Sequence, residues 1–401
     1  MFRKILKSYD YSLVIAVFLL AVFGLIMVYS ASMAMAVQRY GVSSDYFYQK
    51  QKLFLIVAFF VFLLTALFPY KALINNKILG TMVFGSLFLL MALSLFGHVA
   101  GGAQSWIRLG PISIEPSEFV KLCVIIYLSA VYAKKQAYIN EFNKGTVPPL
   151  IYLGLVCLLI ASQPDFGTVE LILLFSSSII LSSGISFKNI KKLIIMALVS
   201  IIPIILIFHN KVFTSKRMDR FSVLKDPFAA AKTSGYHLVN SYIAIGSGGI
   251  NGLGLGKGIE KLGYLPEPHT DFIMAVIAEE LGIWGVGFVI ISLAYIVLRG
   301  FIIATRCKDP FGSLLAIGIS SMIGIQGFVN LAGVSGILPL AGVPLPFVSY
   351  GGSSLIQLAI AVGILVNVSM FVNYEKKYKT ESGAFKIEKR VKKENVYNLR
   401  N

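Results

Sequence analysis

The sequence predicts an all-α polytopic membrane protein with about ten transmembrane helices, and three observations support this fold class. Hydrophobic residues make up 56% of the 401 residues and charged residues only 14%, compared with about a quarter in soluble domains. Apolar runs recur along most of the chain, and several approach the ~20 residues that a helix needs to cross a ~30 Å hydrocarbon core. Basic residues gather in alternate connections between the runs, which is typical of a chain that crosses repeatedly.

The expected spans follow one another from the N-terminus almost to the tail. They are Ser12–Tyr29, Leu53–Phe68, Ile78–Phe96, Phe119–Tyr132, Leu150–Ala161, Gly167–Leu181, Leu193–Phe208, Phe272–Leu298, Phe311–Leu331 and Ser349–Val372. Some are short and some nearly merge, so nine or eleven spans remain alternatives. The first run is longer than the ~7–15 apolar residues of a secretory signal, and we expect it to be retained as a helix.

Charge predicts the orientation. Of the 36 Lys and Arg, 23 fall in the N-terminal segment, the alternate connections and the C-terminal tail. Basic residues are enriched on the cytoplasmic side, so both termini are expected there. The net charge of +17 therefore needs no nucleic acid to explain it.

The chain divides into a transmembrane domain, residues 1–373, and a basic tail, residues 374–401, expected to be cytoplasmic and disordered. Residues 210–271 form a large extracellular loop between the seventh and eighth helices, and this loop carries eight Lys and Arg. Basic residues normally avoid the translocated side. Their presence indicates an anionic ligand there, such as a lipid-linked phosphate.

Two stretches of this loop are suited to binding an anion. Arg217 and Arg220 are three residues apart, so one helical turn would aim both guanidinium groups in the same direction and allow them to clamp a phosphate. A solvated loop is the alternative. Residues 247–258 contain six glycines, whose backbone N–H groups could approach an anion. A flexible hinge explains the glycines equally well.

The loop ends on a carboxylate, Asp271, at the expected membrane face. Glu267 and His269 precede it within four residues, and together they form a candidate polar site. In the alternative interpretation, Thr270 caps the eighth helix and Asp271 lies in its first turn, where the helix dipole favours an anion.

Ionisable residues inside the spans are costly and suggest function. Glu118 and Lys121 are spaced to pair on one helix face, and Lys121 could place a cation near a pyrophosphate. The pair could instead lock two helices together. Glu279 and Glu280 point about 100° apart on a helix, so we interpret both as packing groups.

The last outer connection, residues 336–354, carries no charge and is rich in proline, glycine and serine. These residues favour a broken or re-entrant segment that faces a cavity. The hydroxyls of Ser349 and Ser353 could bind a sugar or belong to a structural turn. The three cysteines show neither paired nor metal-ligand spacing, and no protein metal site is expected.

Several motifs, in this order, carry a resemblance that covers nearly the whole chain before the tail. The matching stretches are 106–108, 115–121, 163–168, 252–256, 265–272 and 344–354. They are similar to those of the SEDS family (FtsW, RodA, SpoVE) of peptidoglycan glycosyltransferases. Residues 8–12 and 309–313 resemble the cell-division members most. Glu115 and His237 depart from the pattern, because glutamine is frequent at both places in the family.

The resemblance implies an enzyme that polymerises lipid II into glycan strands at the outer face of the cell membrane, during septal wall synthesis, by inversion. The growing strand on undecaprenyl pyrophosphate would be the donor, and lipid II the acceptor. By its motif, Asp271 would be the general base. Arg217, Arg220 and Lys121 would stabilise the leaving pyrophosphate.

The resemblance also implies partners and leaves two alternatives. A class B penicillin-binding protein, the transpeptidase, and other division proteins would work with the chain. Mg²⁺ or Mn²⁺ could assist, and no organic cofactor is expected. The alternatives are a lipid II flippase and a noncatalytic division scaffold.

Overall fold

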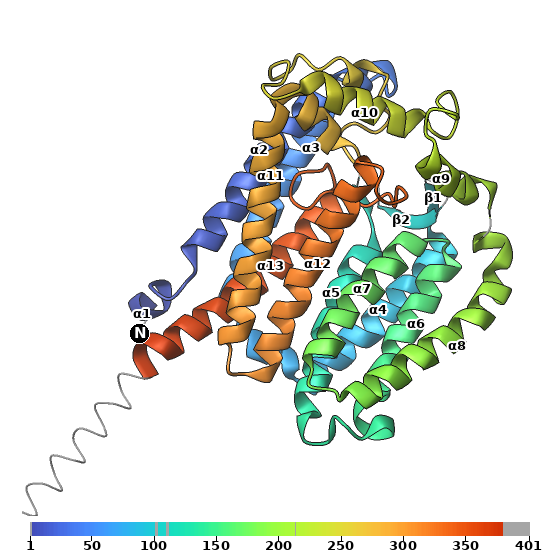
Figure 1. The fold of residues 1–401 in the computed structure, drawn as a ribbon. Helices are drawn as coiled ribbons and strands as arrows, with labels where there is room; N and C mark the ends of the chain where they lie inside the picture. Colours follow the sequence, from blue (N-terminus) through green and yellow to red (C-terminus); the bar gives the residue numbers. More distant parts are fainter. Residues whose placement is uncertain (1, 101–102, 110–111, 213, 380–401) are drawn as a thin grey trace, which may run out of the picture.

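The computed structural model describes residues 2–100, 103–109, 112–212 and 214–379. For some of them, including residues 98–100, 103, 108–109, 112 and 215–217, only the backbone is described. Long helices lie side by side in a bundle, and the chain between α8 and α11 covers one end of it (Figure 1). We call this the loop end. Helix α1 (Phe2–Leu6) and the last described residues lie toward the opposite end.

Each expected span has a helix in the structure. These helices are α2 (Tyr11–Gln38), α3 (Tyr46–Leu67), α4 (Asn76–Phe96), α5 (Pro116–Lys134), α6 (Pro148–Ser162), α7 (Phe166–Ser182), α8 (Phe187–Val212), α11 (Ile273–Arg306), α12 (Pro310–Val334) and α13 (Gly352–Tyr374). Among the described residues, seven helices are long and apolar enough to cross a membrane, and α6 and α7 are shorter apolar helices. The prediction of an all-α, multi-pass membrane protein is confirmed.

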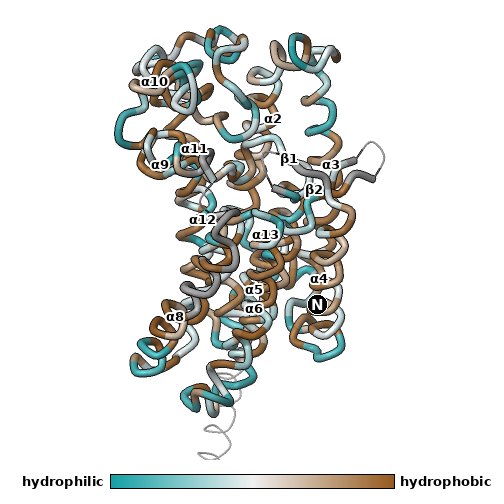
Figure 2. Tube along the Cα trace, turned by 90° about the vertical axis from the view of Figure 1, so that its right-hand side faces the viewer, coloured by the Kyte–Doolittle hydropathy of each residue, from teal (hydrophilic) through white to brown (hydrophobic). Residues whose placement is uncertain are grey.

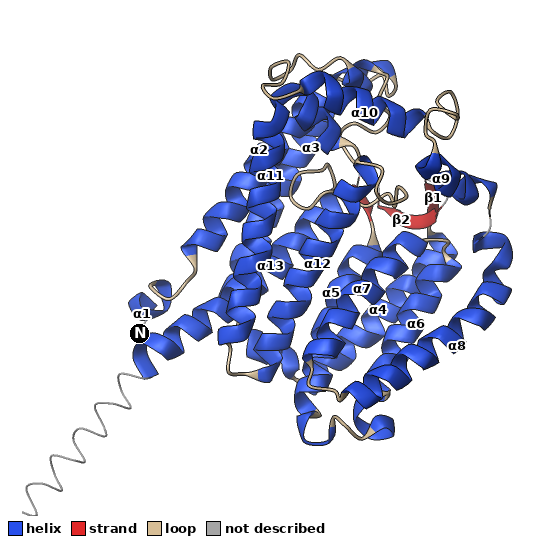
Figure 3. Cartoon of the chain, viewed as in Figure 1, coloured by secondary structure: helices blue, strands red, loops and turns tan. Residues whose placement is uncertain are grey.

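Smaller elements fill the connections. They are α9 (Ser215–Lys225), α10 (Tyr236–Gly248), the short helices η1 (Tyr70–Ile74), η2 (Gln136–Tyr138), η3 (Phe142–Thr146), η4 (Glu260–Leu262) and η5 (Glu375–Lys379), and the strands β1 (His98–Ala100), β2 (Ala103–Leu109) and β3 (Ile112–Ile114). The strands form an antiparallel sheet in the order β1-β2-β3 (Figure 3). The sequence did not predict this sheet. It lies between two spans, where a hairpin pairs backbone groups that no helix satisfies.

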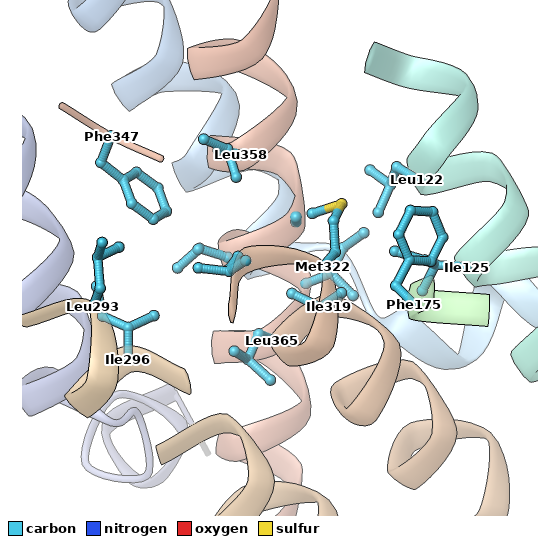
Figure 4. Close-up of a cluster of buried hydrophobic side chains, with 14 of the residues drawn as sticks. Leu122, Ile125, Phe175, Leu293, Ile296, Ile319, Met322, Phe347, Leu358 and Leu365 are labelled. Atoms are coloured by element: carbon cyan, nitrogen blue, oxygen red, sulfur yellow. The ribbon is translucent and has the colours of Figure 1, made fainter. Parts of the chain in front are cut away.

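Helices α12 and α13 form the centre of the bundle. Ile319 and Met322 of α12 are almost fully buried, as are Ile125 of α5 and Phe175 of α7. These side chains gather on one side of α12 in Figure 4, while Leu293 of α11 lies on the other side. Helix α12 thus holds the two halves of the bundle together, so its loop end is a well-supported position for a site.

The outer helices expose apolar side chains to their surroundings. Phe84, Phe88 and Leu95 of α4 are at least two-thirds exposed. Hydrophobic residues line the middle of the bundle, and hydrophilic residues gather toward its ends (Figure 2). This arrangement is expected when the middle of the helices lies in the hydrocarbon core of a bilayer and their ends lie at its surfaces.

Helix α11 is longer than the bilayer requires. Its 34 residues correspond to about 51 Å, and it is broken at Gly282, where φ is 60° and ψ is −151°. Only glycine adopts this conformation without strain. The freed N–H group of Ile283 donates to the carbonyl of Ile250. The turns of α11 before the break therefore contact the chain of the loop end at residues 250–252, while the helix as a whole, Ile273–Arg306, is long and apolar enough to cross a membrane.

Candidate active site

Asp271 lies at the loop end, directly before α11. The chain turns into the helix through Glu267, a non-glycine residue with φ of 52°. Phe272 occupies the N-cap position without a side-chain cap, and the Thr270 hydroxyl donates to the Glu267 carbonyl at 3.2 Å. The alternative in which Thr270 caps this helix is therefore wrong. Asp271 is left outside the helix.

A small pocket opens beside Asp271. It is open to solvent, has roughly 190 Å³ of space when the open part is included, and is lined by Asp271, by Val329, Asn330 and Gly333 of α12, and by residues 340–343. Gly342 has φ of 68°, and a Cβ at this position would lie 3.8 Å from Asp271 Oδ2. The last connection, predicted to be a broken segment facing a cavity, thus forms one wall of the pocket.

Asn330 connects the two sides of this pocket. Its Nδ2 donates to the backbone carbonyl of Asp271 at 3.0 Å and to that of Val343 at 2.8 Å. Gln326, one turn earlier on α12, donates to the carbonyl of Pro344 at 3.1 Å. These two amides fix the backbone of Asp271 and of the opposite wall on one helix face.

The surroundings of Asp271 favour its protonated form. Burial, and secondarily the nearby Glu267 carboxylate, raise its pKa to about 6, while Arg220 acts in the opposite direction. A carboxylate with this pKa is mostly ionised at neutral pH, yet it binds a proton more readily than an ordinary aspartate. Its electrostatic environment therefore suits a general base.

In the described part of the loop, Arg220 is a cation that acts on the Asp271 carboxyl. It lies on α9, and its Nη1 donates to the carbonyl of Leu340 at 2.7 Å, where Leu340 belongs to the pocket wall. Arg217 precedes it by one turn of α9, so the expected helical spacing is present. The side chain of Arg217 lies outside the described part of the chain.

Glu118 and Lys121 pair as the sequence predicts. Lys121 Nζ lies 2.8 Å from Glu118 Oε1 on α5, and both side chains are nearly inaccessible to solvent. Lys121 also reaches Gln326 Oε1 at 3.5 Å. The pair thus contacts Gln326, and Gln326 in turn holds the backbone of Pro344. Lys121 is absent from the lining of the Asp271 pocket.

Glu267 and His269 flank the loop that carries Asp271. Glu267 forms a half-exposed ion pair with Arg39 at 3.2 Å. The His269 ring lies 4.4 Å from the ring of Phe47 and 5.5 Å from that of Tyr350. Burial, aided by Arg39, lowers the pKa of His269 to about 4, so the imidazole is neutral at physiological pH. Both residues support the loop and do not line the pocket.

The hydroxyls of Ser349 and Ser353 join separate segments. Ser349 Oγ donates to the carbonyl of Thr270 at 2.6 Å and accepts from the N–H of Leu345 at 2.9 Å. Ser353 Oγ accepts from the N–H of Glu115 at 3.0 Å. In the described structure both hydroxyls brace the backbone around the site.

The glycine-rich run and the residue after it donate backbone N–H groups to carboxylates of the protein itself. Glu280 Oε2 accepts from the N–H of Gly256 at 2.9 Å, and Glu279 Oε1 accepts from the N–H of Ile259 at 2.6 Å. Lys261 forms a buried ion pair with Glu280. The interpretation of both glutamates as packing groups is confirmed, because they hold the loop against α11.

Sequence analysis missed Asn330 and Gln326. Uncharged amides in an apolar helix gave no charge signal, although their spacing of four places both on one face. Polar residues inside membrane helices often bond across them, so this spacing was the signal that could have found the pair.

Comparisons with known proteins agree with this architecture. The family model described as "Cell cycle protein", which covers FtsW, RodA and SpoVE, matches residues 11–374. Among curated proteins, the chain is 56% identical to the probable peptidoglycan glycosyltransferase FtsW of Bacillus subtilis, over 99% of this chain and 100% of that protein. It is 36% identical to stage V sporulation protein E of the same organism, over 92% of this chain and 98% of that protein.

Two solved structures share the fold. One comes from work on a peptidoglycan synthase complex, with a TM-score of 0.71 at 22% identity, covering 91% of this chain and 98% of that one. The other is the rod shape determining protein RodA of Thermus thermophilus, with a TM-score of 0.65 at 24% identity, covering 90% and 96%. The chain belongs to the FtsW/RodA/SpoVE family of cell cycle proteins.

Proposed function

We propose that this protein is an inverting peptidoglycan glycosyltransferase that polymerises lipid II during septal cell-wall synthesis. Its family and the name of its 56% identical relative support the activity. The observation that carries the mechanism is the Asp271 carboxylate, which lines a pocket at the loop end and has a pKa raised to about 6.

In this mechanism Asp271 acts on the acceptor. The carboxylate takes the proton of the GlcNAc 4-hydroxyl while that oxygen forms a bond to the anomeric carbon of the donor. The bond from this carbon to the pyrophosphate oxygen breaks, the leaving group keeps the electron pair, and the configuration inverts. General base catalysis typically contributes roughly 10²–10⁴-fold.

Positive charge stabilises the leaving pyrophosphate. Arg220 donates to the carbonyl of Leu340, a residue of the pocket wall, and Arg217 lies one turn away on the same helix. Guanidinium groups bind phosphate oxygens in a bidentate manner, and fixed charges aimed at a leaving group lower the barrier. Lys121 adds a cation deeper in the bundle, with part of its field offset by Glu118.

A divalent cation, Mg²⁺ or Mn²⁺, would be held mainly by the substrate. Within the described residues, no three His, Cys, Asp or Glu side chains come together as metal ligands. Mg²⁺ is often bound by phosphate oxygens with one or two carboxylates, and in such a site it would offset pyrophosphate charge. The steps above use groups of the protein alone.

The loop end is proposed to face outward, with both termini in the cytoplasm. The support is the distribution of Lys and Arg, most of which flank the opposite ends of the spans. A class B penicillin-binding protein would crosslink the strands that this protein makes, together with other division proteins. Lipid II and the undecaprenyl-pyrophosphate-linked strand would be its ligands in the membrane.

The test is polymerisation of labelled lipid II by the purified chain, with and without the transpeptidase. Wild type should make long strands, Asp271→Asn should make none, and Asp219→Asn should match wild type. Asp219 is an exposed carboxylate on α9 and serves as the matched control. Strand synthesis by Asp271→Asn would show that Asp271 is not the general base. If wild type makes no strands but lipid II crosses the membrane of vesicles that contain the protein, a flippase would be favoured. If lipid II does not cross either, a scaffold would be favoured.

A further inference from the structure

A second pocket adjoins the Asp271 pocket at the loop end. It encloses roughly 300 Å³, part of it open to solvent, between α9, α10 and the end of α12. Figure 1 shows these elements together at the loop end of the bundle. Gly333 and Leu340 line both pockets, so the two are neighbouring parts of one groove. We call the second part the α9–α10 lobe.

The lobe is aliphatic except at its border. Val223 and Leu224 of α9, Leu238 of α10, and Leu338 and Pro339 of the last connection supply most of its lining. Besides the cation described next, Ser234 is its one polar side chain. A peptide or sugar would bury amide or hydroxyl groups there without enough partners, which is costly. The lining therefore suits a hydrocarbon.

The border carries a cation. Arg220 lines the lobe, and it donates to the carbonyl of Leu340, the residue shared with the Asp271 pocket. A guanidinium group has five N–H donors, and in the described structure this is its one hydrogen bond to the protein. Donors remain for an anion placed between the two pockets.

Gly333 keeps the junction open. A Cβ at this position would lie 3.5 Å from Leu340 Cδ2 and 3.9 Å from the Pro339 carbonyl oxygen. These are ordinary contact distances, so a side chain would fit the fold and would fill the passage. The absence of a side chain on α12 at this place joins the polar pocket to the aliphatic one.

We propose that the α9–α10 lobe binds the first isoprene units of a polyprenyl diphosphate, with its diphosphate at Arg220 and its sugar in the Asp271 pocket. This ligand has the same sequence of chemistry as the groove: polar sugar, anion, branched hydrocarbon. Gly333 lies in the last turn of α12, a membrane-spanning helix that ends at Val334, so the lobe lies where a lipid chain would leave the bilayer surface. The inference rests on the proposed function and identifies where the donor's lipid begins.

The test uses binding, which needs no turnover. Inorganic pyrophosphate and farnesyl diphosphate are titrated against the full-length protein in nanodiscs. Loss of two Leu side chains from an apolar contact with a ligand weakens its binding by about tenfold or more. We expect farnesyl diphosphate to bind at least about tenfold more tightly than pyrophosphate, and Leu224→Ala/Leu338→Ala to lose this gain while still binding pyrophosphate.

Matched controls account for partition of the probe into the bilayer and for folding. Leu255→Ala/Leu262→Ala removes two exposed leucines of the same loop outside the lobe and should keep the gain. Arg220→Gln should weaken both probes. If farnesyl diphosphate binds more tightly than pyrophosphate by the same factor in wild type and in Leu224→Ala/Leu338→Ala, the proposal is overturned.

A soluble disaccharide pentapeptide provides the competing arm. If it displaces farnesyl diphosphate only in proteins with an intact lobe, the lobe belongs to the peptide and the proposal is wrong. Asp271→Asn should bind both diphosphate probes as wild type does. A wild type that binds farnesyl diphosphate in the lobe but never polymerises lipid II would defeat the proposed function and leave the ligand class standing.

Discussion

Asn330 holds the backbone carbonyl of Asp271 at 3.0 Å with the same Nδ2 atom that holds the carbonyl of Val343 at 2.8 Å. One buried side chain of the central helix thus fixes both the carboxylate-bearing residue and the wall that faces it. The carboxylate itself remains available to the pocket, because Asn330 contacts only the backbone of Asp271.

Asn330→Ala should therefore impair the enzyme without touching its carboxylate. The change leaves two carbonyl groups without their donor, and an unsatisfied buried acceptor costs about 1–3 kcal/mol. We expect kcat/KM on lipid II to fall about 10- to 100-fold and the thermal midpoint to drop. Asn251→Ala, at an exposed position of the loop between α10 and α11, should change neither, and a fully active Asn330→Ala would contradict the positioning role.

Asp271→Asn should stabilise the protein that it inactivates. Burial raises the pKa of Asp271 from 3.8 to about 6, so ionisation costs folding free energy. The cost grows as the pH rises from about 4 to 6 and is constant above. Asn removes it, which should raise stability at pH 7 by up to about 3 kcal/mol, less where water reaches the carboxylate.

The pH dependence provides the check on this prediction. Thermal midpoints of wild type and Asp271→Asn should differ most at pH 7, and the difference should shrink as the pH falls toward 4 and vanish below it, where the wild-type carboxyl is protonated in both the folded and the unfolded state. A constant difference at every pH would show that the substitution acts through packing rather than through charge.

Lys261 and Glu280 should act as a latch for the glycine-rich loop. Both side chains are almost fully buried, and Ser30 of α2 donates to the same carboxylate. Lys261→Met leaves a buried charge unpaired, a change that costs about 3–5 kcal/mol. Hydrogen exchange in residues 249–262 should rise sharply, and Lys261→Met/Glu280→Gln should recover part of the protection. Lys257→Met, at an exposed lysine, should leave the exchange unchanged; unchanged exchange in Lys261→Met as well would rule out the latch.

The Glu118–Lys121 pair is expected to have two separable effects. Lys121→Met alone should destabilise the bundle, because Glu118 is left unpaired. In Lys121→Met/Glu118→Gln the thermal midpoint should recover, while turnover stays at least about tenfold below wild type, since the cation beneath the pocket is gone. If turnover recovered fully, the Glu118–Lys121 pair would only hold the helices together and would have no part in the reaction.

The sequence predicted the helices more completely than the connections. Span length and apolar composition are local properties, and each expected span has its helix. The cap at Thr270 was wrong because the chain turns at Glu267, where a positive φ gives no sequence signal. The sheet of residues 98–114 was missed because its pairing depends on contacts between strands.

The candidate site was predictable only through its charges. Asp271 and Arg220 were singled out as charged groups on a loop expected to be extracellular. In the structure Asp271 lines the pocket, and Arg220 donates to the carbonyl of Leu340, which lines the same pocket. Glu279 and Glu280 point apart on their helix, yet both bind the same loop because it wraps over α11 near the break at Gly282. Such long-range wrapping is not encoded in helix periodicity.

The central claim is that Asp271 is the general base, and the pH dependence of kcat/KM on lipid II tests it most directly. For wild type the account predicts a rate that rises with pH, has its midpoint near 6 and is level above it. Asp271→Asn should be at least about 100-fold slower, without that rise. A rise near pH 6 that persists in Asp271→Asn would show that another group takes the proton.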